Sequence, residues 1–195
     1  LEALEFVADE PNTLDLLEQL VNRSLVVTEE RAGEMRYFML ETIRQYGREK
    51  LFAAKQASAA RDRHFIHYKN SSSGLWDVSY SASEVETLRV KSMQVEVENL
   101  RAAFEWGLQN HGQEALDLAA NMAVSMSMMG GQIEGISMLK SAIEKFRTLP
   151  IVEGDGDRVR REIYAHGCFS LGMLLQGTNE IMSSRSGRSA SSEGM

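Results

Sequence analysis

The sequence predicts a mainly α-helical protein that contains a single β-hairpin near its start. Over most of the chain apolar residues recur every three to four positions, which is the spacing of one buried helix face. Two neighbouring runs, residues 25–28 and 35–40, instead have the character of strands around a polar loop that contains Gly33. With 43% hydrophobic and 25% charged residues, the chain has the composition of an ordinary globular protein.

The first predicted unit covers residues 1–56. Asn12 or Thr13 can cap a helix that ends near residues 22–24, because either side chain can accept a bond from a free backbone N–H of the first turn. Its apolar positions fall on one stripe: Leu14, Leu17, Leu20 and Val21. The hairpin follows, and a helix from Glu41 to about Ala54 comes next. Helix, hairpin, helix is the order of the second half of a winged helix, so we predict a partial winged helix here.

Residues 57–94 are predicted to connect this unit to the rest of the chain. A helix over residues 58–68 precedes Ser71-Ser72-Ser73-Gly74, a run of small residues typical of a flexible joint. We place the domain boundary at this run or slightly before it.

Residues 95–182 are predicted to form a helical-repeat array. Helical segments cover residues 95–110, 113–129, 132–147 and 158–176. Glycine or proline marks each break: Gly112, Gly130, Gly131, Pro150, Gly154 and Gly156. Short loops of this kind join antiparallel neighbours. Residues 183–195, rich in Ser, Gly and Arg, cannot bury a core and are predicted to form a disordered tail.

Charge is unevenly distributed along the chain, whose net charge is -7. Residues 1–30 contain eight acidic residues against one base, Arg23, and the sign reverses between residues 31 and 70. Arg44 and Arg48, four apart on one helix face, form a candidate docking surface with Arg36. Glu41 can pair with Arg44, which leaves little free charge for phosphate binding.

The helix before the hairpin would have to enter a DNA groove, yet it carries Asp15 and Glu18. Repulsion from phosphates is therefore expected, and direct DNA contact is not. Winged helices do sometimes bind DNA, so a DNA-binding winged-helix transcription factor remains the alternative hypothesis.

Motifs for catalysis, cofactors or metals are not found in the sequence. It lacks the phosphate-cradling G-x-x-x-x-G-K-[ST] loop, and Gly154-Asp155-Gly156-Asp157 is better read as a helix-capping loop than as a calcium site. His64 and His67 have no third ligand at a matching interval. We therefore expect no enzyme activity, no cofactor and no metal.

Two further residue types allow two interpretations each. Cys168 has no recognisable histidine partner, and packing between helices is the commoner role for such a cysteine. The methionine cluster is interpreted as core in preference to a pliable binding surface: Met122, Met126, Met128, Met129 and Met138.

Three stretches carry a resemblance to a known family: residues 14–17, residues 20–26 and, most specifically, Tyr37 to Tyr46. They resemble the winged-helix segment that follows the ATPase core in bacterial multidomain signalling NTPases of the STAND type, the LuxR-like and nucleotide-cyclase-linked regulators. Downstream, residues 96–103 with Trp106 resemble the helix that opens the tetratricopeptide-like arm of these proteins. The resemblance covers roughly residues 12–147.

The resemblance assigns packing roles within the predicted tetratricopeptide-like α-α hairpins. Gly130 matches the turn, Gly135 and Ala142 match the positions of close helix contact, and Leu139 matches the bulky position between them. In a later unit, Ser170 and Met173 match a small and a bulky position and Gly177 matches the turn. The pattern then fails, which implies a degenerate or truncated second unit.

The family resemblance implies a non-catalytic regulatory or sensor arm of a signal-transducing ATPase or transcriptional regulator. Its expected partners are an upstream nucleotide-binding domain in cis and a protein or small-molecule inducer on the array. A free-standing repeat scaffold is a further alternative. One cysteine, no leader and no apolar stretch of roughly 18 residues favour a cytoplasmic protein without a membrane partner. Because the sequence opens at Leu1 inside a helical pattern, we expect the natural chain to extend upstream.

Overall fold

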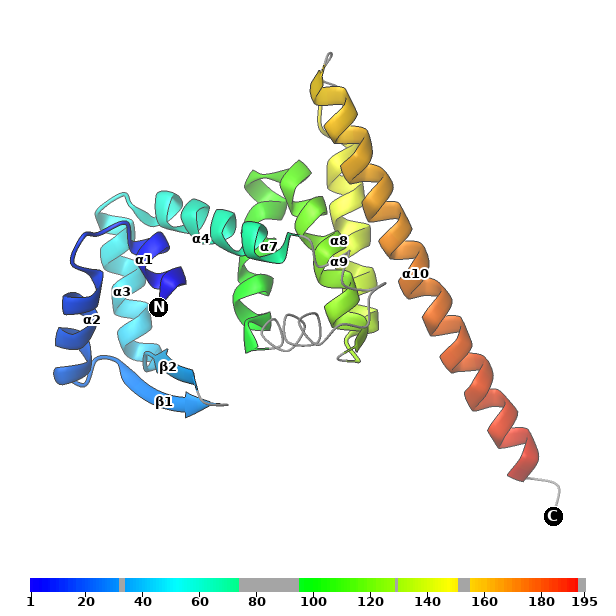
Figure 1. The fold of residues 1–195 in the computed structure, drawn as a ribbon, viewed down its shortest axis with the longest axis horizontal. Coiled ribbons are helices and arrows are strands. Elements are labelled where there is room, and N and C mark those ends of the chain that lie inside the picture. Colours follow the sequence, from blue (N-terminus) through cyan, green and yellow to red (C-terminus); the bar gives the residue numbers. More distant parts are fainter. Residues whose placement is uncertain (32–33, 74–94, 129, 151–154, 193–195) are drawn as a thin grey trace. The chain divides into compact units, whose positions relative to one another are not determined.

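The computed structural model describes residues 1–31, 34–73, 95–128, 130–150 and 155–192 (Figure 1). The expected glycines Gly33, Gly74 and Gly154, Met129, most of the predicted connector and the last three residues of the predicted tail lie outside these ranges. Two compact units divide the chain, Leu1–His67 and Tyr68–Met195. The described residues are mainly helical with one hairpin, as the sequence predicts.

The described residues of the first unit form three helices and a hairpin before its last helix: α1 (Glu2–Ala8), α2 (Thr13–Asn22), the hairpin of β1 (Val27–Arg31) and β2 (Glu34–Phe38), and α3 (Glu41–Ala53). The last helix, α4 (Ala57–Ser72), begins in this unit and runs past its boundary. Three connections use left-handed backbone at residues other than glycine, with φ of 55° at Asp9, 56° at Ser24 and 59° at Lys55. This conformation turns the chain sharply after a helix.

The hairpin is antiparallel, with Val27 opposite Phe38 and Arg31 opposite Glu34. It begins two residues later than the strand-like run in the sequence. The backbone N–H groups of Leu25 and Val26 donate to the carbonyl of Leu20, at 2.9 and 3.3 Å. These two residues therefore satisfy the end of α2 before the chain can enter the sheet.

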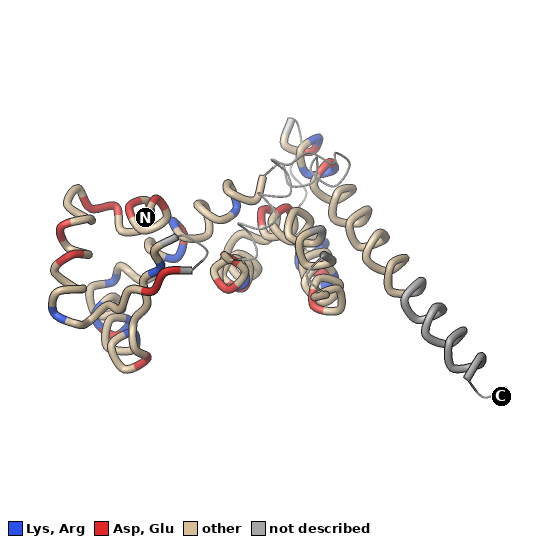
Figure 2. The backbone as a smooth tube through the Cα atoms, turned by 60° about the horizontal axis from the view of Figure 1, so that its bottom comes forward, with Lys and Arg blue, Asp and Glu red and all other residues tan. Residues whose placement is uncertain are grey.

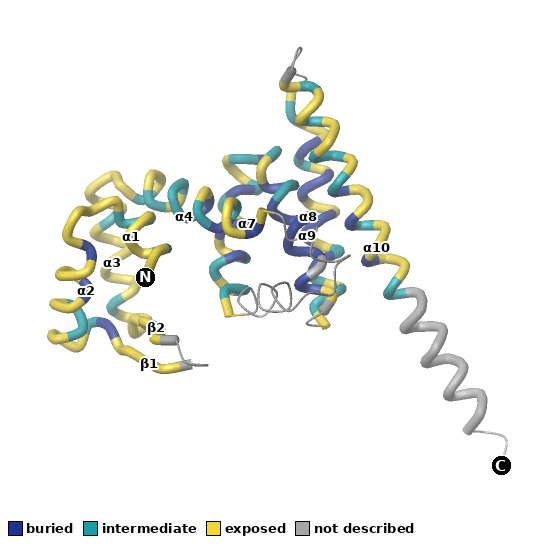
Figure 3. The backbone as a smooth tube through the Cα atoms, in the orientation of Figure 1, coloured by how far each residue is buried: buried dark blue, intermediate teal, exposed yellow. Residues whose placement is uncertain are grey.

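The described residues of the second unit form the last turn of α4 with α7 (Val97–Asn110), α8 (Gly112–Met128), α9 (Gln132–Arg147) and α10 (Asp155–Ser192). Helix α8 packs against α7, α9 and α10. Its buried side chains lie on nearly all sides of the helix, as expected for a helix with three packed neighbours, and are at most 4% exposed: Ala115, Leu116, Leu118, Ala119, Ala120, Asn121, Met122, Ala123, Ser125 and Met126. Figure 3 shows this burial on α8 and α9. Met138 on α9 is also buried, which confirms the core interpretation for three of the five methionines.

The end of the chain differs from the sequence expectation. Residues 183–192, predicted to be disordered, continue α10, and Gly177, expected at a turn, lies inside this helix. The part of α10 that packs on α8 and α9 supplies the helical nucleus, and elongation from a nucleus adds one hydrogen bond for each residue fixed. At Gly177 the amide of Gln132 lies only 2.7 Å from the position of a Cβ atom. This glycine therefore fits a close approach.

Two further expectations are corrected. Ser71 and Ser72 are the last residues of α4 rather than part of a loose joint, and Ser73 forms the turn after it: Ser72 is fully buried, and its hydroxyl donates to the carbonyl of Lys69 at 2.8 Å. Cys168 is exposed on α10 and does not pack between helices, because the neighbouring Gly167 faces α8 instead.

Candidate docking surface of the winged-helix unit

Helix α2 occupies the position before the wing, where a winged helix would read DNA. Thr13 and Leu17 are buried on its inner side, at 6% and 8% exposure. The outer side carries exposed Leu14, Asp15, Leu16 and Glu18. No lysine or arginine lies within the helix. This outer side therefore offers two carboxylates and two leucines, a combination suited to protein rather than to phosphate.

Acidic residues extend from α2 onto α1, as Figure 2 shows near the N-terminus. Glu2 and Glu5 lie in the first turn of α1. Between the two helices is a hollow of about 420 Å³ lined by Glu5, Glu10, Pro11, Asn12, Thr13, Leu14 and Asp15. The negative side of the unit is thus continuous.

The wing, which is the β1–β2 hairpin, exposes apolar side chains on both faces, and on one of them Val27 and Phe38 are 49% and 42% exposed. Met35 and Tyr37 alternate along β2 and lie opposite Glu30 and Thr28. They are 55% and 41% exposed, and Met39, which continues the alternation, is 46% exposed. Arg36 points to the other face, opposite Glu29, and is partly buried. Of the three predicted docking arginines, Arg36 is therefore the least accessible.

Helix α3 buries none of its residues (Figure 3). Tyr46 is 58% exposed and Phe52 is 78% exposed. Arg44 pairs with Glu41, as the sequence predicts, and Arg48 Nη1 lies 3.9 Å from Glu41 Oε1. One carboxylate thus partly neutralises both arginines, so the face is less basic than its sequence suggests.

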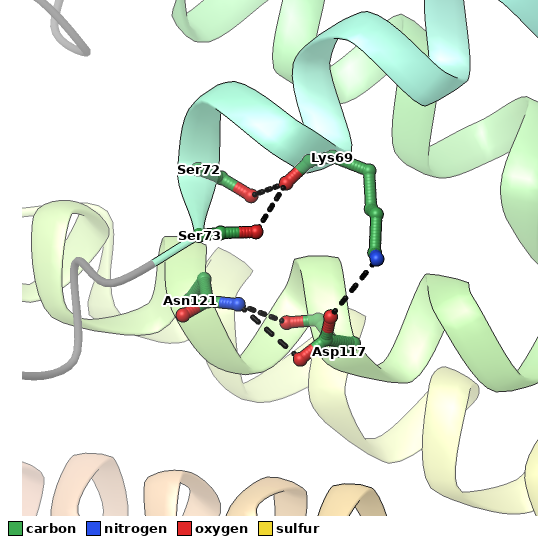
Figure 4. Close-up of polar contacts among 5 residues, drawn as sticks. All are labelled: Lys69, Ser72, Ser73, Asp117 and Asn121. Carbon is green, nitrogen blue, oxygen red and sulfur yellow. Dashed lines mark hydrogen bonds and ion pairs between the residues drawn. The ribbon is translucent and has the colours of Figure 1, made fainter.

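The last part of α4 makes polar contacts with other residues of the first unit before the unit boundary and with residues of the second unit after it. In the first unit, Arg63 Nε donates to the Val7 carbonyl at the end of α1 at 2.7 Å. In the second unit, Tyr68 donates from its hydroxyl to Glu96 Oε2 at 3.0 Å. Lys69 Nζ lies 3.8 Å from Asp117 Oδ2 on α8, and Asn121 donates to the backbone carbonyl of Asp117 (Figure 4).

The predicted repeat-packing residues lie on and just before α9. Gly130 has φ of 77°, which suits the turn between α8 and α9. Leu139 and Ala142 are fully buried. A Cβ atom on Gly135 would lie 3.0 Å from Leu174 Cδ1 on α10 and 3.6 Å from Met126 Cβ on α8. Gly135 thus lies where three helices meet.

Two contacts of the helical array were not predicted from the sequence. Gly167 is a tighter approach than Gly135, because its Cβ would lie 2.5 Å from Leu116 Cδ1. The spacing of Gly167, Ser170 and Leu174 along one helix face is the signal that could have found it. Arg101 on α7 donates two hydrogen bonds to Glu134 on α9, at 2.5 and 2.6 Å, and these bonds raise the pKa of Arg101. Neighbours so far apart in sequence give no local signal.

Residues 2–52 match the family model of the winged helix-turn-helix domain. This stretch of the chain is a winged helix-turn-helix domain. Proteins named "Putative HTH-type transcriptional regulator" from Mycobacterium tuberculosis (strain H37Rv) and Mycobacterium bovis are each 35% identical to the chain over 137 residues. The match covers 70% of this chain and 15% of each relative, so the chain spans a small part of their length.

No solved structure matches the chain. Among the described residues, no helix is long and apolar enough to span a bilayer, and no group of three or more His, Cys, Asp or Glu residues is placed to hold a metal ion.

Proposed function

We propose that this chain is the non-catalytic regulatory segment of a transcriptional regulator, and that its winged helix-turn-helix domain binds protein rather than DNA. The partner is a nucleotide-binding domain of the same protein, of the STAND type. The helical array binds a protein or small-molecule inducer, and its state is relayed to the domain. The homology to proteins named as transcriptional regulators supports the regulatory part of this proposal.

The outer side of α2 is the observation that carries the proposal. A recognition helix normally meets phosphates and base edges with arginine, lysine or amide side chains. Here Asp15 and Glu18 would meet the phosphates, and Leu14 and Leu16 would be placed in a polar groove. Both features favour a protein surface, which can cover leucines and pair carboxylates.

The lack of burial in α3 points in the same direction. A free helix of 13 residues is only marginally stable in water, and α3 has this length and no buried side chain. A neighbouring domain that covers Tyr46, Phe52 and Leu40 would supply the missing stabilisation. The relatives are several times longer than this chain, which supports the existence of such a domain in the same protein.

A DNA reader is the second candidate, because the family model that matches is a helix-turn-helix and α3 contains Arg44, Arg48 and Lys50. Under this hypothesis, affinity for duplex DNA falls steeply between about 50 and 200 mM salt. Our proposal expects no sequence-specific affinity, and at most the non-specific level of about 10⁻⁴–10⁻⁶ M.

One pair of double variants separates these candidates. Arg44→Glu with Arg48→Glu places three carboxylates on one exposed face of α3, counting Glu41. The matched control is Arg158→Glu with Arg161→Glu on α10, where the arginines also pair along the helix and are 82% and 75% exposed. Circular dichroism should show all variants folded.

The proposal expects the α3 variant to bind the nucleotide-binding domain on the order of tenfold more weakly in a pull-down titration, while the control binds as the native chain does. Phe52→Ser should also weaken docking without lowering the melting temperature, because the Phe52 side chain is 78% exposed. Docking unchanged in both α3 variants, together with sequence-specific DNA binding of about 10⁻⁸ M or tighter that the double variant abolishes, would establish the DNA reader instead.

A further inference from the structure

Helix α4 belongs to both units of the chain. It runs without interruption from Ala57 to Ser72, and the boundary between the units falls between His67 and Tyr68. Such a helix can carry a change in one unit to residues of the other, because its backbone hydrogen bonds form and break cooperatively.

On the side of the first unit, α4 holds the end of α1 by three contacts. The Arg63 guanidinium donates to the Val7 carbonyl at 2.7 Å, and its Nη1 lies 3.9 Å from Asp9 Oδ2. The ring of His67 lies 5.6 Å from the ring of Phe6, between centroids. Since α1 buries no residue of its own, these contacts and its packing against α2 hold it in position.

On the side of the second unit, the last turn of α4 is held by Tyr68, Lys69 and Ser72. Tyr68 is 6% exposed and donates to the carboxylate of Glu96, the residue that precedes α7. Lys69 pairs with Asp117 of α8, as Figure 4 shows. Ser72 is fully buried. The last turn of α4 therefore contacts both α8 and the residue that precedes α7.

These two sets of contacts are close together along one helix. Six residues separate Arg63 from Lys69, a rise of about 9 Å or less than two helical turns. We propose that the last turn of α4 is the coupling element of this chain: contacts of Tyr68 and Lys69 with α7 and α8 control how firmly Arg63 and His67 hold α1. A ligand that moves α7 or α8 thereby changes the order of the acidic α1–α2 side of the winged helix-turn-helix domain.

This inference gives a route for the relay in the proposed function and rests on it for its biological purpose. Its test needs neither DNA nor a partner domain, so the coupling and the docking proposal can fail separately. The decisive variant is Tyr68→Phe, which removes one hydroxyl and keeps the buried ring. Tyr164→Phe is the matched control, because the Tyr164 hydroxyl accepts hydrogen bonds from Arg147 at 2.8 and 2.9 Å between α9 and α10, away from α4.

The readouts are NMR signals of the whole chain: amide exchange on the millisecond timescale for residues 5–9 and 63–72, and the ring protons of His67, which sense the Phe6 ring. Loss of a hydrogen bond to a carboxylate corresponds to about a tenfold change in a local opening equilibrium. Tyr68→Phe should raise exchange by about that factor in the last turn of α4. It should also raise exchange at residues 7–9 and shift the His67 ring signals, whereas Tyr164→Phe should change neither.

Coupling must be reciprocal, so Arg63→Met should raise exchange in residues 68–72. If Tyr68→Phe leaves the chain unfolded, Lys69→Met serves in its place, since the Lys69 side chain is 30% exposed and its loss is mild. The proposal is overturned if the Tyr68→Phe variant leaves the exchange in α1 and the His67 ring signals as in the native chain. This holds whether exchange in residues 68–73 rises or not.

Discussion

Alanine substitution at three glycines of the helical array tests the packing in this structure. Replacing glycine by alanine within a helix favours the folded state by about 1 kcal/mol, because the backbone loses less freedom on folding. The gain is the same at each site, and only the space for the new methyl group differs. The three variants therefore measure packing against a common reference.

Gly172 on α10 has no atom within 4 Å of the position of a Cβ, so Gly172→Ala should stabilise the chain by the full ~1 kcal/mol. At Gly135 the nearest atom is the terminal methyl of Leu174 at 3.0 Å, which can yield by a few tenths of an ångström, so Gly135→Ala should be close to neutral. At Gly167 the methyl would lie 2.5 Å from Leu116 Cδ1 and 3.0 Å from its Cγ. Leu116 is fully buried, so Gly167→Ala should cost a net ~1–2 kcal/mol.

Thermal melts, monitored by circular dichroism at the helix band, rank the three variants by stability. About 1 kcal/mol shifts the melting temperature of a chain of this size by roughly 2–4 °C, so Gly172→Ala and Gly167→Ala should differ by several degrees. Both sites are on α10, five residues apart, which removes differences between helices. If the melting temperature of the Gly167→Ala variant equals or exceeds that of the Gly172→Ala variant, the packing of α10 on α8 is refuted.

Three further predictions follow from the same residues. Gly135→Leu should destabilise the array by ~1–3 kcal/mol through overpacking, with Gly172→Leu as the neutral control in the same melts; equal melting temperatures would contradict the repeat alignment. Arg101→Met should cost about 0.5–1 kcal/mol in urea unfolding at low salt and less at high salt, because the Arg101 side chain is 36% exposed and its pair with Glu134 is screened; a cost that is unchanged by salt would assign its effect to packing alone. Calorimetric titration of the chain with ATP should show no micromolar binding, since its sequence lacks a phosphate-cradling loop, and measurable heat at that level would be evidence for another nucleotide site.

Sequence patterns located most elements of the described residues to within a few positions. The helix predicted from Thr13, the hairpin and the helix from Glu41 are all present. The pairing of Glu41 with Arg44 was also predictable, because residues three apart on a helix are neighbours whatever surrounds them. Predictions of this kind depend only on the local geometry of a helix or a strand.

The errors concern positions whose surroundings come from distant segments. Ser72 has the sequence character of a joint, yet it is buried at the end of a packed helix. Gly177 has the character of a turn, yet it makes room for Gln132 from α9. Cys168 has the size of a packing residue, yet it faces solvent while its neighbour Gly167 meets Leu116. In each case a small residue is compatible with several roles, and only the approaching helix selects one.

The sequence by itself determined the helical class, the order helix–hairpin–helix and the acidic character of residues 1–30, because periodicity and charge are local properties of the chain. Only the tertiary structure decided that α3 lies open, that Gly167 is the tightest helix contact among the described glycines, and that α4 serves both units. These features depend on distances between segments far apart in sequence, such as Arg63 and Val7 or Lys69 and Asp117. Such distances are set when side chains pack together, and no spacing within a single segment encodes them.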